Sequence, residues 1–412
     1  MEDLETYKLE DLGFLARGKS RHRPRNDQSL FGGKYPFIQT GEVKAAEFYI
    51  NSFEDTYNEK GLAQSKLWEP GTLLITIAAN IAETAILDIK ACFPDSILGF
   101  IPDEDKADVR FIKYYIDTIK LKMQSISRGT TQDNLSLQKL RSIDFNVPSV
   151  SKQKRIADVL TAFDDLITNN TRRIEILEEM ARRIYREWFL HFRYPGHEDD
   201  DPSTGSGQRL VDSGTDFGEI PEGWEVKKLE DLCELTLGQS PKSEFYNEKG
   251  EGLPFHQGVR DFGDRYPTTT TWCVKDKRIA EEGDILFSVR APVGRINIAN
   301  TKMIIGRGLH SIRSKFDNQV FIFHQLKDKF QEEDSMGSGT IYKSVTKKIM
   351  LNLKLIDPGE ELIKKFEEKA VPIFNQIKTL TDKNDKLKET RDLLLPKLIS
   401  GKIDVKEMEL TI

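Results

Sequence analysis

The sequence predicts an α+β fold in which two similar globular domains are joined by two long helices that pair as an antiparallel coiled coil. Two observations carry this prediction: an internal repeat that spans most of the 412 residues, and a heptad pattern that closes each half of the repeat. A third observation is the stretch 194–223, whose Pro, Gly, Ser and acidic residues are typical of a flexible linker. Such a linker would let the second half fold back beside the first.

The internal repeat defines the two globular domains, which we assign to 1–150 and 224–358. A period of roughly 210 residues indicates a duplicated domain, because solenoid repeats have periods of about 20–50 residues. A run of strand-like sequence closes each copy, at Pro148 and at Pro358. The other blocks that return in the same order are YKLEDLG (7–13) and KKLEDLC (227–233), YPFIQ (35–39) and LPFHQ (253–257), WEPGTLLITIAANIAETAIL (68–87) and AEEGDILFSVRAPVGRINIA (280–299), and SRGT (127–130) and SGT (338–340).

Two helices are predicted over 151–193 and 359–400, with 401–412 as a tail. In both, seam residues alternate at spacings of four and three, and this average of about 3.5 residues indicates a coiled coil. Pro396 is expected to kink or end the second helix. The seam residues are Ile156, Leu160, Phe163, Ile167, Asn170, Ile174, Leu177, Ala181, Ile184 and Trp188 in the first helix, and Phe366, Ala370, Ile373, Ile377, Leu380, Asn384, Leu387, Arg391, Leu394 and Leu398 in the second.

One polar residue interrupts each apolar seam, Asn170 in the first helix and Asn384 in the second. If the helices pair antiparallel with the largest overlap, these two residues face each other. A polar pair inside an apolar seam commonly fixes the register at some cost in stability. We expect the two amides to hydrogen-bond; the alternative is that a small rotation of the helices leaves one or both in water.

Composition and charge are ordinary for a soluble protein and exclude one that coats nucleic acid nonspecifically. The net charge is −6, from 61 basic and 67 acidic residues, and 194–223 alone carries one basic and eight acidic residues, or −7. The rest of the chain is therefore close to neutral, which does not fit a nonspecific basic coat. The three cysteines are far apart, which fits a reducing cytoplasm, and no apolar run reaches the ~20 residues of a membrane span.

Signs of catalysis are few, and we expect neither a catalytic centre nor a metal site. The sequence has no GxGxxG after a strand, no GxxxxGK[ST], no HExxH and no methyltransferase NPPY-like or DPPY-like tetrapeptide. One loose nuclease-like string exists, in which Asp95, Glu104 and Lys106 could surround Mg²⁺. A Mg-dependent nuclease is therefore kept as an alternative, although this segment also has the composition of an exposed acidic loop.

The layout and four local motifs resemble the specificity subunit of type I restriction-modification systems, over nearly the whole chain. One departure is the start of the second helix, EELI (360–363), which lacks the Gln of the first. The motifs that are similar to those of the family are KQKRI (152–156) after Pro148, RRIYREWFLHF (182–192) at the end of the first helix, PEGW (221–224) at the opening of the second domain, and RDLLLPKLISGKI (391–403) near the C-terminus.

The resemblance implies that 1–150 and 224–358 are target-recognition domains, which the coiled coil holds at opposite ends in inverted orientation. It implies that the ligand is double-stranded DNA with a bipartite, asymmetric target, whose unread spacer depends on helix length. Two modification subunits would bring S-adenosylmethionine, and restriction subunits would use ATP and Mg, whereas this chain would bind no cofactor. The alternatives are the specificity subunit of a related multisubunit methyltransferase system and a purely structural coiled-coil scaffold.

Residues that contact bases are expected in loop-like segments, because amide and guanidinium groups suit bidentate contacts to adenine and guanine. For any one of them the alternative is a turn or a solvated surface. In the first domain the candidates are Gln39, Thr40, Asn80, Arg128, Thr130 and Gln132. In the second they are His256, Gln257, Arg260, Arg290, Arg295, Arg307, Ser338, Thr340, Tyr342 and Lys343.

Three aromatic residues near the end of the first helix are candidates for docking partner subunits: Trp188, Phe189 and Phe192. Together they offer more apolar surface than one coiled coil needs. The alternative is that they pack under the adjoining domain.

Overall fold

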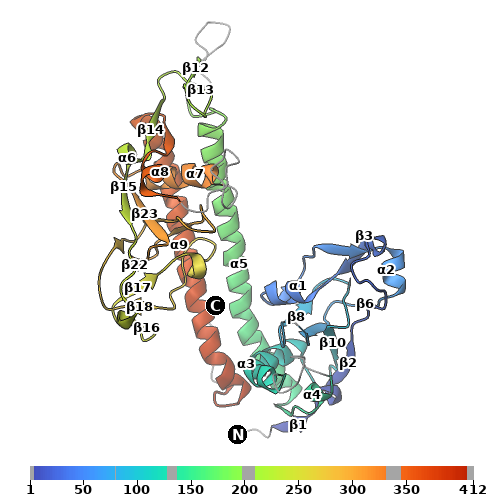
Figure 1. Ribbon diagram of the computed structural model, residues 1–412. Helices are drawn as coiled ribbons and strands as arrows, with labels where there is room; N and C mark the ends of the chain where they lie inside the picture. The colour runs from blue at the N-terminus through green and yellow to red at the C-terminus, as the bar shows by residue number, and fades with distance from the viewer. Residues whose placement is uncertain (1–3, 79, 128–136, 197–208, 331–344, 406–412) are drawn as a thin grey trace. The chain divides into compact units, whose positions relative to one another are not determined.

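The computed structural model describes residues 4–78, 80–127, 137–196, 209–330 and 345–405 (Figure 1). Its internal contacts divide the chain into two units. Unit 1 comprises Met1–Arg172 and Leu380–Ile412, and unit 2 comprises Arg173–Thr379. Each unit contains one globular domain and a segment of each long helix.

The globular domain of unit 1 contains two sheets and a covering helix. The first sheet has the order β2-β10-β7-β8-β4 and the second β5-β3-β9-β6, while β1 pairs with β11. Helix α3 (Val109–Ser127) lies against the first sheet (Figure 1). The bounds are β1 Glu5–Tyr7, β2 Gly13–Arg17, β3 Phe31–Phe37, α1 Thr40–Ala45, β4 Tyr49–Ile50, β5 Asp55–Tyr57, α2 Glu59–Ala63, β6 Leu67–Trp68, β7 Leu73–Thr76, β8 Thr84–Leu87, β9 Ala91–Cys92, β10 Ile97–Pro102, α4 Leu137–Arg141 and β11 Phe145–Val147.

The core of unit 1 follows from the two-residue period of β7. Leu73 and Ile75 pack with α3 residues on one face of the sheet, whereas Leu74 packs with Trp68 on the other. Successive side chains of a strand point to opposite faces, so a strand that is buried on both faces is apolar throughout. The sheet is therefore the middle layer of this domain.

The globular domain of unit 2 repeats this arrangement. Its sheets have the orders β15-β23-β20-β21 and β16-β18-β17-β22-β19, and β14 pairs with β24. Helix α7 (Gln319–Lys329) takes the place of α3. The bounds are β14 Glu225–Lys228, α6 Leu229–Leu232, β15 Cys233–Leu237, β16 Tyr246–Asn247, β17 Leu253–His256, β18 Trp272–Cys273, β19 Ile279–Ala280, β20 Ile285–Ser288, β21 Ile296–Ile298, β22 Met303–Ile305, β23 Leu309–Ser314, α8 Lys347–Leu351 and β24 Lys354–Asp357.

Strand pairing confirms the duplication that the sequence predicts. A parallel pair joins β3 to β9 in the second sheet of unit 1 and β17 to β22 in the second sheet of unit 2, and the other strand pairs described in these two sheets are antiparallel. A glycine follows the first strand of each main sheet, and its N–H donates to a carbonyl of the neighbouring strand. These hydrogen bonds join Gly18 to Ile97 at 2.9 Å and Gly238 to Leu309 at 3.0 Å.

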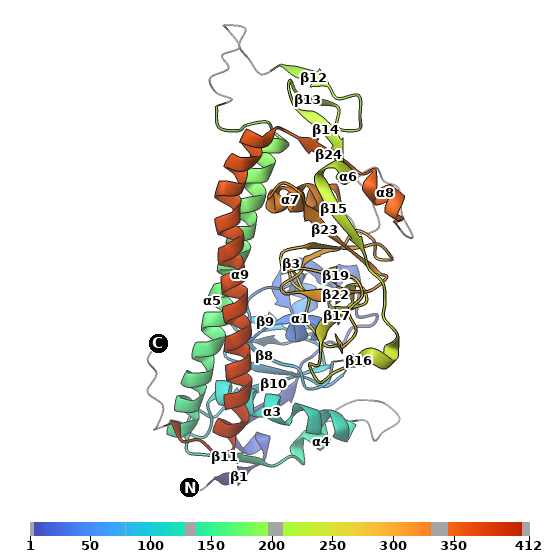
Figure 2. The ribbon, with the colours of Figure 1, turned by 90° about the vertical axis from the view of Figure 1, so that its left-hand side faces the viewer.

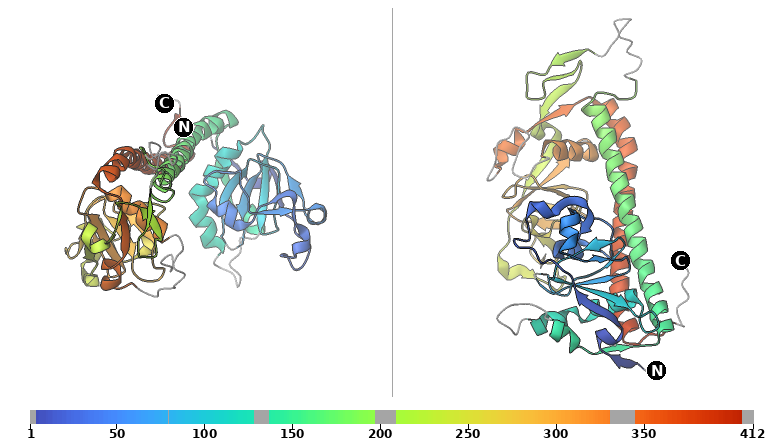
Figure 3. Two further views of the ribbon diagram at one scale, coloured as in Figure 1. Left: turned by 90° about the horizontal axis from the view of Figure 1, so that it is seen from above. Right: turned by 90° about the vertical axis from the view of Figure 1, so that its right-hand side faces the viewer.

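The two predicted helices are α5 (Val150–Phe189) and α9 (Glu360–Ile399), and both cross the boundary between the units. Their facing segments run side by side within each unit (Figure 2; Figure 3). The predicted seam residues Ile156 and Leu398 are fully buried in unit 1, as is Phe366 in unit 2. Helix α9 continues through Pro396 to Ile399, so of the two expectations for this proline, a kink or an end, the helix does not end there.

The two seam asparagines lie together in unit 1 and are almost fully buried, with 9% of Asn170 and 6% of Asn384 exposed. Asn170 Nδ2 donates to Asn384 Oδ1 at 2.9 Å, which is the hydrogen bond expected from the heptad pattern. Asn384 Nδ2 in turn lies 3.3 Å from the Ile167 carbonyl and 3.3 Å from Thr171 Oγ1, and it donates to both. The pair is therefore satisfied inside the seam instead of being wetted.

A further polar link joins both long helices to α3 in unit 1. The Tyr114 hydroxyl donates to Asp164 on α5, and Asp164 also accepts from the Arg391 guanidinium on α9. Burial raises the pKa of Tyr114, as does the neighbouring Asp164 carboxylate. Tyr114 therefore stays protonated and remains a hydrogen-bond donor at neutral pH.

Part of the predicted flexible linker has regular structure. Within 194–223, β12 (Leu210–Asp212) pairs antiparallel with β13 (Glu219–Pro221). Ile220 is buried in the core of unit 2, near Trp224. Linker composition alone did not show this hairpin, because its turn residues are the same Gly, Ser and Asp that mark flexible chain.

We expect single and double substitutions of the asparagine pair to be strongly non-additive. Asn170→Leu or Asn384→Leu leaves one buried amide without its partner, at a cost of about 1–3 kcal/mol. The double variant removes both amides, so it should unfold at a higher temperature than either single variant. It should also populate other registers or oligomers, because the polar pair no longer specifies one. Thermal unfolding and sedimentation measure these effects, with exposed Asn375→Leu on α9 as the control. Additive losses of stability would contradict the pairing.

Gly18→Ala should destabilise unit 1, because a Cβ there would lie 2.3 Å from the Pro94 carbonyl oxygen and 2.4 Å from Phe93 Cδ2. Forcing such an overlap typically costs about 1–3 kcal/mol. The matched control is Gly41→Ala in α1, where a Cβ would meet nothing within 4 Å. A lower melting temperature is expected for the first variant and an unchanged or slightly higher one for the second. Equal melting temperatures would show that the close approach at Gly18 is unimportant.

Candidate nucleic-acid interface

Loops at equivalent places in the two units form two similar clusters. In unit 1 the β7–β8 loop is fixed to the β9–β10 loop by a hydrogen bond from Ile77 N–H to the Ser96 carbonyl, at 3.0 Å. In unit 2 the β20–β21 loop is fixed to the β22–β23 loop by the same bond, from Val289 N–H to the Gly308 carbonyl, also at 3.0 Å. The segment after β3 or β17 completes each set, which we call the loop cluster of that unit.

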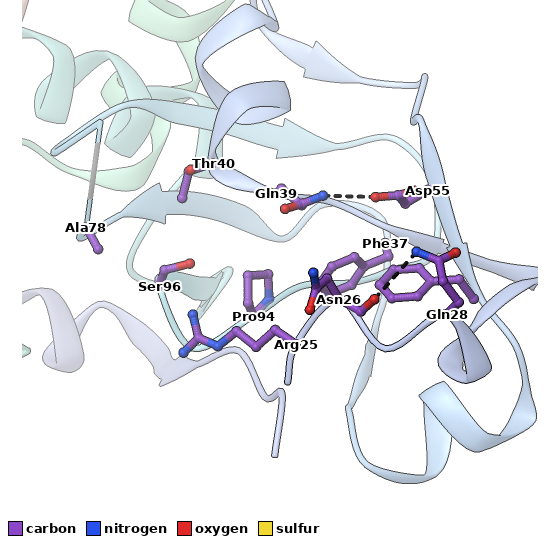
Figure 4. Close-up of a pocket in the computed structure, with 11 residues that line it drawn as sticks. Arg25, Asn26, Gln28, Phe37, Gln39, Thr40, Asp55, Ala78, Pro94 and Ser96 are labelled. Atoms are coloured by element: carbon purple, nitrogen blue, oxygen red, sulfur yellow. Dashed lines mark hydrogen bonds between the residues drawn. The ribbon is translucent and has the colours of Figure 1, made fainter. Parts of the chain in front are cut away.

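The loop cluster of unit 1 surrounds a cavity of about 430 Å³ (Figure 4). Phe31 and Phe37 contribute rings to its lining. The polar side chains that line it carry amide, guanidinium, carboxylate and hydroxyl groups, which are the groups that hydrogen-bond to base edges. They are Arg25, Asn26, Gln28, Gln39, Thr40, Asp55 and Ser96.

Gln39 and Thr40, both predicted from the sequence, lie on one side of this cavity (Figure 4). Gln39 Nε2 donates to Asp55 Oδ2 at 2.9 Å, and the Gln39 N–H donates to Glu42 Oε2 at 2.6 Å. These bonds orient the side chain before any ligand arrives, which lowers the entropy cost of binding. The predicted Asn80 is half-buried in the β7–β8 loop, where its carbonyl accepts from the Thr76 hydroxyl; Ala78 of that loop lines the cavity.

The loop cluster of unit 2 brings together several of the predicted residues. Ser240 Oγ donates to Gln257 Oε1 at 2.7 Å, and the Arg307 N–H donates to Ser240 Oγ at 3.3 Å. The side chains of Gln257, Arg290 and Arg307 are exposed. The predicted Arg260 is also exposed, just after Gln257, whereas Arg295 is half-buried at the start of β21.

His256 does not fit the predicted role in base contact, because it is fully buried. Its Nδ1 lies 3.7 Å from Asp261 Oδ2, and its Nε2 lies 3.4 Å from the Thr269 hydroxyl. Burial lowers the pKa of His256, which favours the neutral ring. Its neighbour Gln257, directly after β17, is the exposed residue of this pair.

Seven of the predicted contact residues lie outside the described part of the chain, so the prediction for them stands as made from the sequence. They are Arg128, Thr130, Gln132, Ser338, Thr340, Tyr342 and Lys343.

The predicted docking role of Trp188 and Phe189 was wrong, because both are buried in the core of unit 2. Phe189 meets Phe366 edge-on at 5.3 Å between ring centroids, and Trp188 meets the same ring at 6.1 Å. Phe192 is half-buried and lies edge-on to Trp224 at 5.4 Å. Phe189 also meets Phe321 of α7 edge-on at 4.7 Å, so these rings pack both on α9 and under the globular domain of unit 2, which was the alternative considered for them.

The residues of the nuclease alternative do not form a metal site. Asp95 Oδ1 accepts from Arg25 Nη2 at 2.5 Å, and Lys106 Nζ lies 3.4 Å from Asp103 Oδ2. Within the described ranges, no group of three or more His, Cys, Asp or Glu side chains is arranged to hold a metal ion. The nuclease-like pattern in the sequence therefore comes from an acidic loop and from the ion pair of Asp95 with Arg25.

The sequence analysis missed several residues of the unit 1 cavity. Arg25, Asn26 and Gln28 lie in the loop between β2 and β3, which has no matching block in the internal repeat. Asp55 was missed because its position opposite Gln39 depends on the pairing of β3 with β5. The one available signal was the polar composition of RPRNDQ (23–28).

Among the helices of the described ranges, none has both the length and the apolar character needed to cross a bilayer.

Comparison with known proteins supports one family. The family described as type I restriction modification DNA specificity domain matches residues 1–179 and 221–392. A putative type I restriction enzyme MjaX specificity subunit from Methanocaldococcus jannaschii is 31% identical over 98% of this chain and 95% of its own length. The type I restriction enzyme HindI specificity subunit from Haemophilus influenzae is 25% identical, over 98% of this chain and 100% of its own.

The fold is similar to that of a solved protein of the same type. A crystal structure of a type I restriction-modification system S subunit from M. genitalium matches with a TM-score of 0.61 and 16% identity, over 96% of each chain. Two copies of the family domain, two repeated sheet frameworks and a relative aligned over nearly its full length agree with one another. The chain is therefore a member of the type I restriction-modification DNA specificity subunit family.

Proposed function

We propose that this chain reads a bipartite, asymmetric sequence in double-stranded DNA, one half-site with each loop cluster. The observation that carries the proposal is that one framework is present twice and displays different side chains at matching places. The equivalence of the loops places Ala78 of unit 1 where unit 2 has Arg290, and Asp95 where unit 2 has Arg307. Two readers with different side chains select different half-sites.

The side chains of the loop clusters suit base edges in the major groove. Gln39 and Gln257 can pair with the N6 and N7 atoms of adenine, and Arg290 and Arg307 with the O6 and N7 atoms of guanine. The half-buried Arg295 and the exposed Arg260 are more suited to phosphate contacts, which position the protein without reading sequence. The candidates near SRGT and GSGT, which lie outside the described residues, remain part of this proposal.

Helices α5 and α9 would set the unread spacer between the half-sites. Each has 40 residues, or about 60 Å at 1.5 Å per residue. Both run from one unit into the other, so a change in their length alters the distance between the loop clusters without touching either one. The buried Asn170–Asn384 pair would hold the register that defines this distance.

This chain would provide recognition and assembly, with the chemistry on partner subunits. Two modification subunits would carry S-adenosylmethionine and methylate adenine, and restriction subunits would use ATP and Mg to translocate and cleave. Exposed apolar side chains on α5, Ile176 and Met180, are spaced four residues apart and offer a docking stripe in place of Trp188 and Phe189. Because the target would be the host's own DNA, we place the complex in the cytoplasm.

Co-expression with the modification subunit encoded beside this chain tests the proposal. Long-read detection of modified adenines in host DNA should give one bipartite, asymmetric motif that requires this chain. Unmodified DNA despite an active, assembled partner would instead favour a structural scaffold. An assay for ATP-dependent cleavage of unmodified DNA separates a restriction system from the related methyltransferase-only alternative.

Substitutions in unit 2 should change the second half-site alone. Arg290→Ala and Arg307→Ala each remove a guanidinium, and loss of one bidentate contact costs about 1–3 kcal/mol of discrimination, or roughly ten- to a hundredfold. The affected position of the motif should become degenerate while the other half-site stays unchanged. Lys302→Ala, which removes an exposed positive charge from the same unit away from the loop cluster, is the control. A change in both half-sites would contradict independent reading.

A further inference from the structure

The loop between β2 and β3 in unit 1 is exposed but held in place by its own hydrogen bonds. Gln64 Oε1 accepts from Arg21 N–H at 2.6 Å and from His22 N–H at 3.0 Å. His22 Nε2 lies 2.7 Å from Asp27 Oδ2, and Asp27 Oδ1 accepts from the Ser29 N–H at 2.9 Å. The position of the side chains on this loop is therefore defined without a ligand.

Arg25 lies on this loop, and its guanidinium lines the unit 1 cavity (Figure 4). Its Nη2 donates to Asp95 Oδ1 at 2.5 Å. Asp95 is also 3.8 Å from Arg23 Nη2, and Arg23 Nη1 donates to the Ser20 and His22 carbonyls at 2.7 and 2.8 Å. Asp95 is thereby fixed between two guanidinium groups, and it orients Arg25.

Comparison of the two loop clusters indicates a role for the Arg25–Asp95 ion pair. Asp95 occupies the position of Arg307, because the β9–β10 and β22–β23 loops are fixed by equivalent hydrogen bonds. Unit 2 thus places a guanidinium on this loop directly. Unit 1 has a carboxylate at that position, and the carboxylate holds a guanidinium that comes from the preceding loop. Both units therefore present an arginine at the same point of the framework, from different places in the sequence.

We propose that Arg25 is a specificity-determining residue that reads a guanine in the first half-site, and that Asp95 is the positioning residue that holds it. Arginine donates to the O6 and N7 atoms of guanine with two N–H groups, and this geometry requires an oriented guanidinium plane. Arg25 is about half exposed, at 48%, and Asp95 takes up one edge of it. Across the described residues, Asp95 takes one N–H of Nη2 and no hydrogen bond is seen from Nε or Nη1, so the second N–H of Nη2, together with an adjacent N–H of Nε or Nη1, can form the two-donor contact.

The ion pair also distinguishes a base contact from a phosphate contact. A carboxylate beside the guanidinium repels phosphate oxygens, so the pair gains little from the charge of the DNA backbone. A neutral base edge with two acceptors is not repelled in this way. The cavity walls opposite Arg25 carry Gln39 and Thr40, which add donors and acceptors at the same place (Figure 4).

The test rests on the proposed function and uses the same readout of modified adenines, with variants Arg25→Ala, Arg25→Lys and Asp95→Asn. Wild type should require G at one position of the first half-site. Arg25→Ala should lose that requirement, with preference for G falling roughly ten- to a hundredfold. Arg25→Lys should not restore it, because lysine lacks the planar fork. Asp95→Asn should weaken the preference at the same position only.

Lys34→Ala is the matched control, since Lys34 is an exposed cation of the same domain, paired with Glu59 and outside the cavity lining. It should leave the motif unchanged. Melting temperatures of all variants should stay close to wild type, because exposed ion pairs contribute little to stability. A motif that Arg25→Ala leaves intact, or a uniform fall in modification at every site, would overturn the role assigned to Arg25 but not the proposed function. Absence of any bipartite motif with wild type would overturn the proposed function instead.

Discussion

The pairing of α5 with α9 is the constraint on which the rest of the structure depends. Apolar residues at alternating spacings of four and three are buried or half-buried along the facing segments in each unit. Among the described residues of this seam, the amides are Asn170 and Asn384, and they bond to each other. An amide left alone in that seam would be costly, so the hydrogen bond favours one alignment of the helices over its neighbours. The Asp164 link from α9 to α3 then ties the globular domain of unit 1 to this alignment.

On the proposed function, stability and recognition would reside in different residues of the repeated domain. The frameworks are kept by buried strands and by glycines such as Gly18 and Gly238, where any side chain would collide with backbone. The loop positions that differ between units, such as Asp95 and Arg307, lie outside these contacts. A protein built in this way can change what it binds without losing its core. The same separation would allow one sequence to contain the two proposed readers with unlike side chains.

Periodic features could be predicted from the sequence, whereas contacts between distant segments could not. The heptads predicted both helices to within a few residues. They also placed Asn170 opposite Asn384, because the heptad spacing and the largest overlap of two antiparallel helices determine which residues face each other. Burial of His256 and Phe189 was not visible, since an alternating or helical pattern does not reveal what covers a residue. Arg25 and Asp95 are 70 residues apart in loops, and no local pattern links them.

The central claim is that the paired helices set the distance between two independent readers. Inserting three heptads into each helix at the unit boundary, near Arg172 and Leu380, adds about 31 Å, close to the 34–36 Å of one DNA turn. Because this nearly preserves the rotational phase of the DNA, both readers can still engage it. Target selection from random DNA, with the modification subunits present, should return the same two half-sites with a spacer longer by about one turn. An unchanged spacer, or an altered half-site, would contradict the claim.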